Sequence, residues 1–437
     1  MNKHWPYHIT HLSLDKSISV PPLLGKNQGN YLVFWWKNLP LGHLILGPNA
    51  LTSEARYYAQ LLQAIKPAIE RYNTSSLAWE QALLAKNFQE WKNCLEPIME
   101  PHTAAPVPAQ VPVSVVICTR NRPKQLQKCL KQLKTLVCLP EEIIVVDNAP
   151  SDDSSQKVAQ PFREVTYVRE PRAGLDIARN TGIQQASCPI VAYLDDDVVV
   201  HPLWVYQVWD TFQNPGTAAM TGLVLASELE TEAQYLFEKH WSFNRGYTDK
   251  VFDAHFFQSQ LTLGPPVWDI GAGANMAFRK SALEEVGYFD EVLDVGAAGC
   301  SGDSEMWFRL LAHGHAIHYN PRAVVHHEHR KDLKGLRKQI FYYMRGFTTA
   351  ALLQQQQVPT ANYQRRLFRV IPKHYYLMVV RGFPRYQDRN RTLWAEIKGI
   401  LSGYSFYLRN RKKSTIRQEK PVMAPPLAPI DLKTSLQ

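Results

Sequence analysis

Between residues 113 and 194, short runs of β-branched residues alternate with longer segments whose apolar residues recur every three or four positions. A strand buried on both faces of a parallel sheet gives the first pattern, and an amphipathic helix gives the second. The alternation predicts strands at 113–118, 143–146, 165–168 and 189–194, with helices at 123–136 and 174–186. Strands and helices of these lengths form a parallel α/β sheet with right-handed crossovers.

Polar residues follow three of the predicted strands at the points where those strands end. Residues 119–122 (TRNR) follow the first strand, Asp147 follows the second, and residues 195–197 (DDD) follow the fourth. Ligands of open α/β sheets bind at the carboxyl ends of strands, so we expect these side chains to share one edge. Taken singly, each segment also fits a solvated loop or a helix cap, since Asn and Thr are good caps.

The run Asp195, Asp196, Asp197 is the most unusual of these strand ends. Three adjacent carboxylates repel one another unless a cation lies close, and alternate residues of a strand present two of them to one side. Oxygen ligands suit Mg²⁺ or Mn²⁺, which complete their coordination with substrate phosphates. A plain acidic loop is the alternative.

Two segments downstream also carry chemistry. Residues 302–309 (GDSEMWFR) begin an apolar periodic helix, so Asp303 falls in its first turn, where the helix dipole favours a carboxylate whatever its function. Residues 324–330 (VVHHEHR) end a further strand with three histidines, and neutral imidazole is a common ligand of Mn²⁺-type ions. A polar strand end explains the histidines equally well.

Four segments resemble, in order and spacing, the successive blocks of glycosyltransferase family 2, which has the GT-A fold: SVVICTRNRP, IIVVDNAPSDD, REPRAGLDIARNTG and IVAYLDDDVVVHPLW. The match is specific because four blocks agree, whereas a DxD motif alone occurs widely by chance. Together with the flanks, it predicts an α/β fold with a GT-A type, mostly parallel sheet flanked by helices. A small α+β N-terminal module and a helical, basic C-terminal region complete the expected fold class.

The resemblance implies a role for each matching position. The nucleotide-sugar contacts would come from Thr119, Arg120, Asn121, Arg122, Asp147, Arg172, Gly174, Arg179, Asn180, Asp195 and Asp196. Mn²⁺ or Mg²⁺ would be held by Asp195, Asp197 and His327, with His329 as the second choice for the imidazole. Asp303 would be the general base that accepts the proton of the acceptor hydroxyl.

The segment WDIGAGANMAFR, residues 268–279, resembles the acceptor side of the family and supplies Gly273 and Asn275. It is not a dinucleotide fingerprint, because Met276 stands where the third glycine is required. Family members usually carry Glu-Asp before the catalytic helix, whereas this chain has Gly302 and Asp303. Glu305 is the nearby carboxylate that we expect on the acceptor side.

By resemblance, the chain is an inverting glycosyltransferase of the hexosyltransferase type. The expected donor is UDP- or dTDP-linked, the acceptor is a saccharide or lipid-linked saccharide, and the setting is cell-surface polysaccharide synthesis. One alternative is a sugar-phosphate nucleotidyltransferase, but TRNRPKQ lacks the glycines of the phosphate loop that it would need. A non-catalytic binding protein on a transferase fold is the other.

Composition and pattern along the chain predict five segments. These are an accessory module at 1–95, a Pro-rich linker at 96–112, the catalytic domain at 113–335, a helical basic aromatic region at 336–420 and a disordered tail at 421–437. In the module we expect two strands within 31–47, around a turn at 38–42, and helices between residues 53 and 91. The module shows no recognisable chemistry.

The net charge of +10 is concentrated near the C-terminus. Residues 362–420 hold fifteen Lys or Arg against three acidic residues, interspersed with aromatic residues. Such a stretch suits an anionic membrane surface, with a helical cap on the catalytic domain as the plainer alternative and nucleic acid as an unlikely partner. The cysteines show no zinc or disulfide spacing, and no apolar run suggests an export signal or a membrane span. We therefore expect a cytoplasmic protein, peripheral at the inner face of the membrane if the basic region binds lipid.

Overall fold

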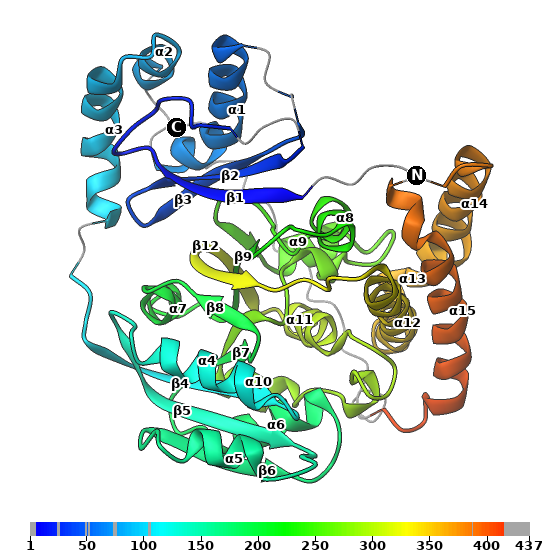
Figure 1. Ribbon diagram of the computed structural model, residues 1–437. Helices are drawn as coiled ribbons and strands as arrows, with labels where there is room; N and C mark the ends of the chain where they lie inside the picture. Colours follow the sequence, from blue (N-terminus) through cyan, green and yellow to red (C-terminus); the bar gives the residue numbers. More distant parts are fainter. Residues whose placement is uncertain are drawn as a thin grey trace, which may run out of the picture.

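The computed structural model describes residues 6–23, 27–48, 50, 53–72, 77–103, 106–386 and 388–414. Three parts follow one another along the chain: an N-terminal module, a large sheet with flanking helices, and a group of C-terminal helices (Figure 1). In Figure 1 the module lies above the large sheet, and the C-terminal helices stand at its right. The tail predicted at 421–437 lies outside the described residues.

The module contains a three-stranded sheet of β1 (Tyr7–Ser13), β2 (Gly29–Trp36) and β3 (Leu39–Leu46). The two predicted strands are β2 and β3, which pair antiparallel, but the turn between them is shorter than expected because Leu39 already pairs with Trp36. Strand β1 was not predicted and pairs parallel to β2. Its sequence, YHITHLS, is partly exposed and polar, so it lacks the apolar run of a buried strand.

Helices α1 (Glu54–Tyr72), α2 (Ala78–Leu84) and α3 (Phe88–Thr103) pack on one face of this small sheet. Helix α3 extends to Thr103, so the segment that we expected to be a linker from residue 96 begins as helix. Trp91, Leu95 and Met99 are buried at helical spacing, and this burial outweighs the prolines at 97 and 101. The opposite face of the sheet packs on the central sheet through Tyr31, Val33 and Trp35.

The central sheet has nine strands in the order β10-β12-β9-β11-β7-β4-β5-β6, with β8 paired to β12. Its strands are β4 (Gln110–Thr119), β5 (Leu139–Asn148), β6 (Val165–Glu170), β7 (Ile190–Asp195), β8 (Val198–Val200), β9 (Thr217–Ala226), β10 (Lys250–Phe252), β11 (Asn275–Arg279) and β12 (Ala316–His327). Strands β4 to β7 are mutually parallel, as the alternation predicts. Beyond them the sheet is mixed, because β11 runs antiparallel to both β7 and β9.

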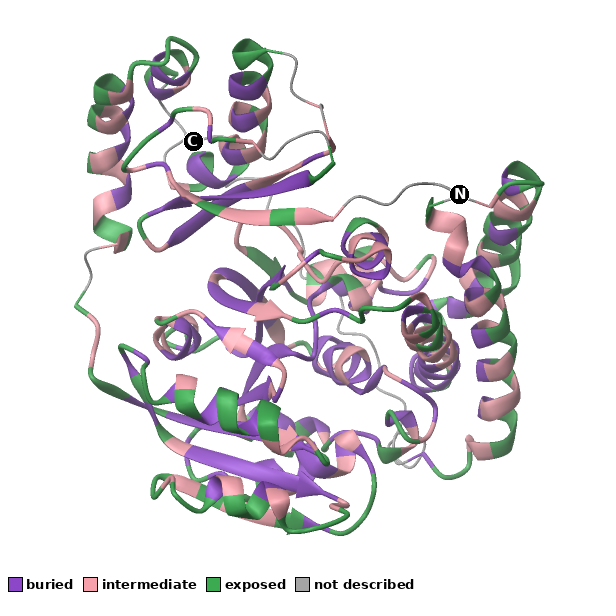
Figure 2. Ribbon diagram, viewed as in Figure 1, coloured by how far each residue is buried: buried purple, intermediate pink, exposed green. Residues whose placement is uncertain are grey.

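Helices cover both faces of this sheet. They are α4 (Pro123–Leu133), α5 (Ser154–Ala159), α6 (Leu175–Gln185), α7 (Trp204–Thr211), α8 (Glu232–Trp241), α9 (Ala254–Ser259), α10 (Lys280–Val286) and α11 (Gly302–Ala312). One apolar core joins the sheet to α4 and α7, and a second joins its other face to α6, α10 and α11. The strands between these layers are buried (Figure 2). The predicted α/β class, a large sheet flanked by helices, is therefore confirmed, with antiparallel pairs in the second half of the sheet.

The C-terminal region is helical, as expected, and contains α12 (Leu333–Gln357), α13 (Tyr363–Arg365), α14 (Ile371–Gly382) and α15 (Leu393–Asn410). A π-helical segment, Arg366–Val370, joins α13 to α14. Helices α12 and α15 lie against each other, and a Cβ on Gly399 or Gly403 would meet the α12 backbone at 2.5 Å. Within the described residues, none of the helices has both the length and the apolar character needed to cross a membrane.

Candidate active site

The carboxyl ends of the parallel strands bring the predicted polar residues together. Thr119 at the end of β4 lies opposite Asp147 on β5, and Cys118 lies opposite Asp195 on β7. Three strand ends that are far apart in sequence therefore meet at one edge. We call this edge, with Asp147 and the acidic run, the donor side.

Within the acidic run, Asp196 is held by protein groups. The Thr119 hydroxyl donates to its Oδ2 at 2.7 Å, and the Arg122 guanidinium donates to its Oδ1 at 3.0 Å. Asp196 is 5% exposed, and burial raises the pKa of its carboxyl. Its side chain therefore holds the strand end together, and two residues expected at the nucleotide, Thr119 and Arg122, are its partners.

The other two aspartates form a group with His327. Ligand atoms of Asp195, Asp197 and His327 all lie within 4.8 Å of one another. Strand β8 produces this arrangement, because it starts directly after the acidic run and pairs with β12 so that Val198 lies opposite His327. Two carboxylates and one imidazole make a donor set that Mn²⁺ or Mg²⁺ can use, so the predicted residues fit a divalent cation.

The electrostatics of this group favour a bound cation. Burial, and next the like charge of Asp197, raise the pKa of Asp195 to about 7. Burial lowers the pKa of His327 to about 4, which keeps its ring neutral and able to coordinate. Arg122 donates to Asp197 at 2.9 Å and supplies part of the compensating charge.

Asp147 faces the same edge from β5. The Tyr167 hydroxyl donates to its Oδ2 at 2.8 Å, whereas its Oδ1 is buried with no hydrogen-bond partner among the described residues. Burial raises the pKa of this carboxyl. An unpartnered buried acceptor is costly, so a ligand that donates a hydrogen bond to it would be favoured.

Asp303 lies in the first turn of α11, as predicted. Its Oδ2 accepts a hydrogen bond from the backbone of Gly273 at 2.8 Å, and its Oδ1 accepts one from Ser304 at 2.7 Å. A Cβ on Gly273 would lie 2.9 Å from Asp303 Oδ2 and 2.8 Å from Arg179 Nη2, so only glycine fits between them. We call Asp303, Gly273 and the residues packed on them the base side.

Asp176 in α6 explains why position 302 is a glycine. A Cβ on Gly302 would lie 2.0 Å from Asp176 Oδ2, so the Asp176 carboxylate fills the place that a side chain at 302 would take. Arg179 donates to Asp176 at 2.9 Å, and burial raises the pKa of Asp176 to about 7. The acidic residue missing before Asp303 thus has a carboxylate from another helix in its place.

Arg179 connects the two sides. Its buried guanidinium interacts electrostatically with Asp176 and Asp303 on the base side and with Asp195 on the donor side. The acidic run and Asp303 therefore both lie within electrostatic range of the same guanidinium.

Comparisons with known proteins identify the family of the central part of the chain. Residues 114–287 match the sequence model of the family described as Glycosyl transferase family 2. This segment is a family 2 glycosyltransferase domain. The predicted family and the predicted class of enzyme, a transferase, are therefore confirmed for this domain.

Individual relatives cover part of the chain. The chain is 28% identical over 240 residues to the pre-mycofactocin glycosyltransferase of Mycobacterium tuberculosis. The aligned segment makes up 54% of this chain and 47% of that protein. It thus spans about half the length of this relative. The succinoglycan biosynthesis protein ExoM of Rhizobium meliloti is 26% identical over 246 residues, covering 52% of this chain and 72% of its own. A solved mannosyltransferase from Pyrobaculum calidifontis, in complex with GDP-Man and Mn²⁺, superposes with a TM-score of 0.44 at 16% identity. The superposition covers 70% of this chain and 90% of the mannosyltransferase.

The α6 segment of the glycosyltransferase domain, which was expected to contact the nucleotide sugar, is held by protein groups at its first turn. Asp294 accepts hydrogen bonds from the backbone of Leu175 and Asp176, so a protein carboxylate occupies the first turn of the helix. Gly174 leaves room for this carboxylate, because a Cβ there would lie 2.2 Å from Asp294 Oδ2. Arg172 is turned to the surface, where it pairs with Glu170 and Glu291.

Three predicted site residues have structural partners instead. The Asn180 amide exchanges two hydrogen bonds with the backbone of Phe289. Asn275 is fully buried and bonded to Trp204, Leu223 and Ala323. Glu305 is also fully buried and forms an ion pair with Arg309 at 2.5 Å. In this structure the side chains of these residues support the domain core.

The remaining predicted residues, Arg120 and Asn121, follow β4. Arg120 is exposed, and Asn121 has a positive φ of 55° and bonds to Ser151 in the loop after β5. Asn121 therefore ties two strand-end loops of the donor side together. Asp176 is the residue that sequence reasoning missed, although its block was recognised, because only the close packing of Gly302 reveals it.

Proposed function

We propose that the chain transfers a sugar from a nucleotide-sugar donor to a saccharide or lipid-linked saccharide acceptor, with inversion at the anomeric carbon. The observation that carries the proposal is the group of Asp195, Asp197 and His327, whose ligand atoms lie within 4.8 Å of one another, together with Asp303 oriented by the backbone of Gly273. Inverting transfer needs these two functions on opposite faces of one sugar: charge stabilisation at the leaving group and a base at the attacking hydroxyl.

On the donor side, Asp195, Asp197 and His327 would hold Mn²⁺ or Mg²⁺. A divalent cation bound there would act as a Lewis acid that stabilises the diphosphate leaving group. Asp147 offers its unpartnered Oδ1 to a nucleobase. Uracil and thymine both carry an imide N–H that can donate to such an acceptor, which supports a UDP- or dTDP-linked donor.

On the base side, Asp303 is already oriented by two backbone N–H groups, from Gly273 and Ser304. Each of its oxygens retains a lone pair for the acceptor hydroxyl. The Arg179 guanidinium interacts electrostatically with Asp303, and its hydrogen bond to Asp176 fixes Arg179 in place. Removal of the proton by Asp303 would accompany attack of the hydroxyl oxygen on the anomeric carbon, and the nucleoside diphosphate leaves from the opposite face.

The experiment that tests this proposal incubates the protein with a panel of nucleotide sugars, Mn²⁺ and candidate oligosaccharides. We expect release of a nucleoside diphosphate from a uridine or thymidine donor, with an inverted anomeric configuration in the NMR spectrum of the product. Synthesis of a nucleotide sugar from a sugar phosphate and a nucleoside triphosphate would instead support a nucleotidyltransferase. Donor binding without any turnover would support a binding protein.

We further propose that the C-terminal helices attach the enzyme to an anionic membrane surface where a lipid-linked acceptor would be presented. Trp394, Leu401 and Leu408 recur every seven residues on α15 and are 53%, 67% and 51% exposed. Tyr376 and Phe383, on and after α14, are also exposed. Lysines and arginines are interspersed among these residues along the sequence, and Glu396 is withdrawn into a buried pair with Arg389.

Vesicle sedimentation tests this membrane surface. The protein should sediment with phosphatidylglycerol vesicles and remain in solution with phosphatidylcholine vesicles. The double substitution Trp394→Ser and Leu401→Ser should abolish sedimentation, whereas Leu77→Ser, at a residue that is 67% exposed on the N-terminal module, should have no effect. Equal sedimentation of all variants, or retention on nucleic acid in place of vesicles, would contradict it.

A further inference from the structure

A chain of hydrogen bonds leads from the N-terminal module to the metal group. The Tyr31 hydroxyl on β2 donates to Glu238 Oε1 at 3.0 Å. Glu238 Oε2, on α8, lies 3.0 Å from Nε2 of His329, and Nδ1 of His329 lies 3.1 Å from Nδ1 of His327. Tyr31, Glu238 and His329 are each at most 6% exposed, so the chain runs through the interior.

Hydrogen bonding along the chain determines which nitrogens carry protons. A carboxylate can only accept, so His329 must donate its Nε2–H to Glu238. The Nδ1 of a neutral His329 then has a lone pair and accepts the Nδ1–H of His327. His327 is thereby left with its lone pair on Nε2, the nitrogen that is free to coordinate a cation. The reverse order, in which His327 accepts at Nδ1, requires a His329 that carries protons on both ring nitrogens, and it would leave the His327 proton on Nε2.

We propose that Glu238 and His329 are positioning residues that fix the tautomer and ring orientation of His327, and that Tyr31 makes the N-terminal module part of the metal site. This inference rests on the proposed metal group and deepens it. Groups that orient a metal-binding histidine through its second nitrogen raise the basicity of the ligand and reduce the freedom that it must lose on binding.

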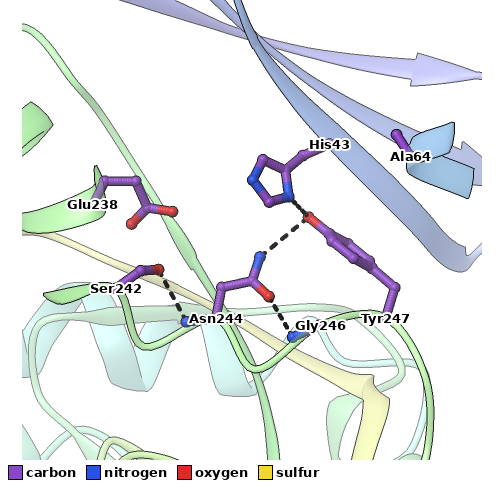
Figure 3. A pocket seen from close by; sticks show the side chains of 7 residues that line it. All are labelled: His43, Ala64, Glu238, Ser242, Asn244, Gly246 and Tyr247. Atoms are coloured by element: carbon purple, nitrogen blue, oxygen red, sulfur yellow. Dashed lines mark hydrogen bonds between the residues drawn. The ribbon is translucent and has the colours of Figure 1, made fainter. Parts of the chain in front are cut away.

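The surroundings of Glu238 explain how the module acts on it. Strand β3 of the module brings His43 to a cavity of about 370 Å³ that Glu238 also lines, together with Asn244 and Tyr247 (Figure 3). His43 accepts or donates a hydrogen bond with the Tyr247 hydroxyl at 2.9 Å and stacks on Tyr31 with 5.1 Å between ring centroids. The module therefore holds the Tyr31 ring in the position from which its hydroxyl reaches Glu238.

The neighbouring histidine provides a matched control. His326 precedes His327 on β12, and because side chains alternate along a strand, it points to the other face. Its ring lies 5.5 Å from that of His11. It takes no part in the bonds between Tyr31, Glu238 and His329, so His326→Phe changes the same residue type beside the metal group without touching the chain.

Two measurements test the proposal on the full-length protein. In an EPR titration of free Mn²⁺, His329→Phe should weaken Mn²⁺ binding by about tenfold to a hundredfold. Tyr31→Phe should weaken it by a smaller factor, and His326→Phe should leave it unchanged. In the metal-free wild type, the nitrogen NMR spectrum of ¹⁵N-histidine-labelled protein should show His327 protonated at Nδ1, with the signal assigned by its loss in His327→Phe.

Each outcome bears on a separate claim. An unchanged Mn²⁺ affinity in His329→Phe, or a His327 ring protonated at Nε2, would overturn the proposal. An unchanged affinity in Tyr31→Phe alone would exclude the module from the metal site. If wild-type protein bound no Mn²⁺, the metal group itself would be wrong, whereas the nitrogen spectrum would still test the hydrogen-bond chain. That spectrum also decides the matter if His329→Phe does not fold.

Discussion

The donor side and the base side of the site are built in different ways. On the donor side, Asp147 and Asp195 lie at the carboxyl ends of β5 and β7, the two parallel strands that flank β4, and Asp197 follows in the turn before β8. On the base side, the position of Asp303 depends on two glycines that lack side chains. Gly273 leaves room for Arg179, and Gly302 leaves room for Asp176. Regular strands can therefore place a metal group, whereas the base depends on close packing between segments distant in sequence.

Of the substitutions that separate the donor side from the base side, Asp303→Asn should have the largest effect on turnover. The amide cannot accept the proton, so turnover should fall by about 10² to 10⁴, the range for loss of a general base. Donor and Mn²⁺ binding should be unaffected, because Asp303 does not belong to the metal group. Steady-state transfer and calorimetric titration on the same preparation check both statements. Retained turnover would remove Asp303 from the reaction.

A second large effect concerns stability on the base side. Glu305→Gln weakens the fully buried ion pair with Arg309 and should lower the free energy of unfolding by about 3 kcal/mol. The KM for the acceptor should stay the same, because Glu305 supports the helix and does not reach the site. Thermal unfolding and acceptor titration measure the two quantities. A raised KM at unchanged stability would restore Glu305 as an acceptor contact.

A smaller effect is expected from Gly302→Ala. Its Cβ would meet the Asp176 carboxylate, and such overpacking costs about 1 to 3 kcal/mol. Asp176→Ala removes the obstructing atoms, so the double variant should be more stable than the sum of the two single effects predicts. A double-mutant cycle of unfolding free energies checks this coupling. Strict additivity would mean that Asp176 does not fill the place of a side chain at 302.

The sequence predicts the donor side more completely than the base side, because strand ends follow from a local pattern whereas close packing between distant segments does not. Strand periodicity and the polar residues after each strand identify Asp147, Asp195 and Asp197 without knowledge of packing. Asp176, by contrast, becomes visible only when its distance to Gly302 is known. Asn275 and Glu305 were assigned to the acceptor from their place in a motif, and only their burial shows that they serve the core.

The same limit applies to the fold. The parallel strands β4 to β7 follow from alternation of apolar runs, whereas β1 is polar and depends on its partner β2. The prolines of α3 suggested a linker because they disfavour a helix locally, but burial of Leu95 and Met99 in the module stabilises it. In each case a contact distant in sequence outweighed the local pattern.

The central claim is a metal group on the donor side that acts separately from the base Asp303. It is tested most directly by calorimetric titration of the donor nucleotide with and without Mn²⁺, in wild type, Asp197→Ala and Asp303→Asn. We expect Mn²⁺ to tighten binding in wild type and Asp303→Asn, and Asp197→Ala to lose that gain. The same nucleotide affinity with and without Mn²⁺ in the wild type would contradict the account.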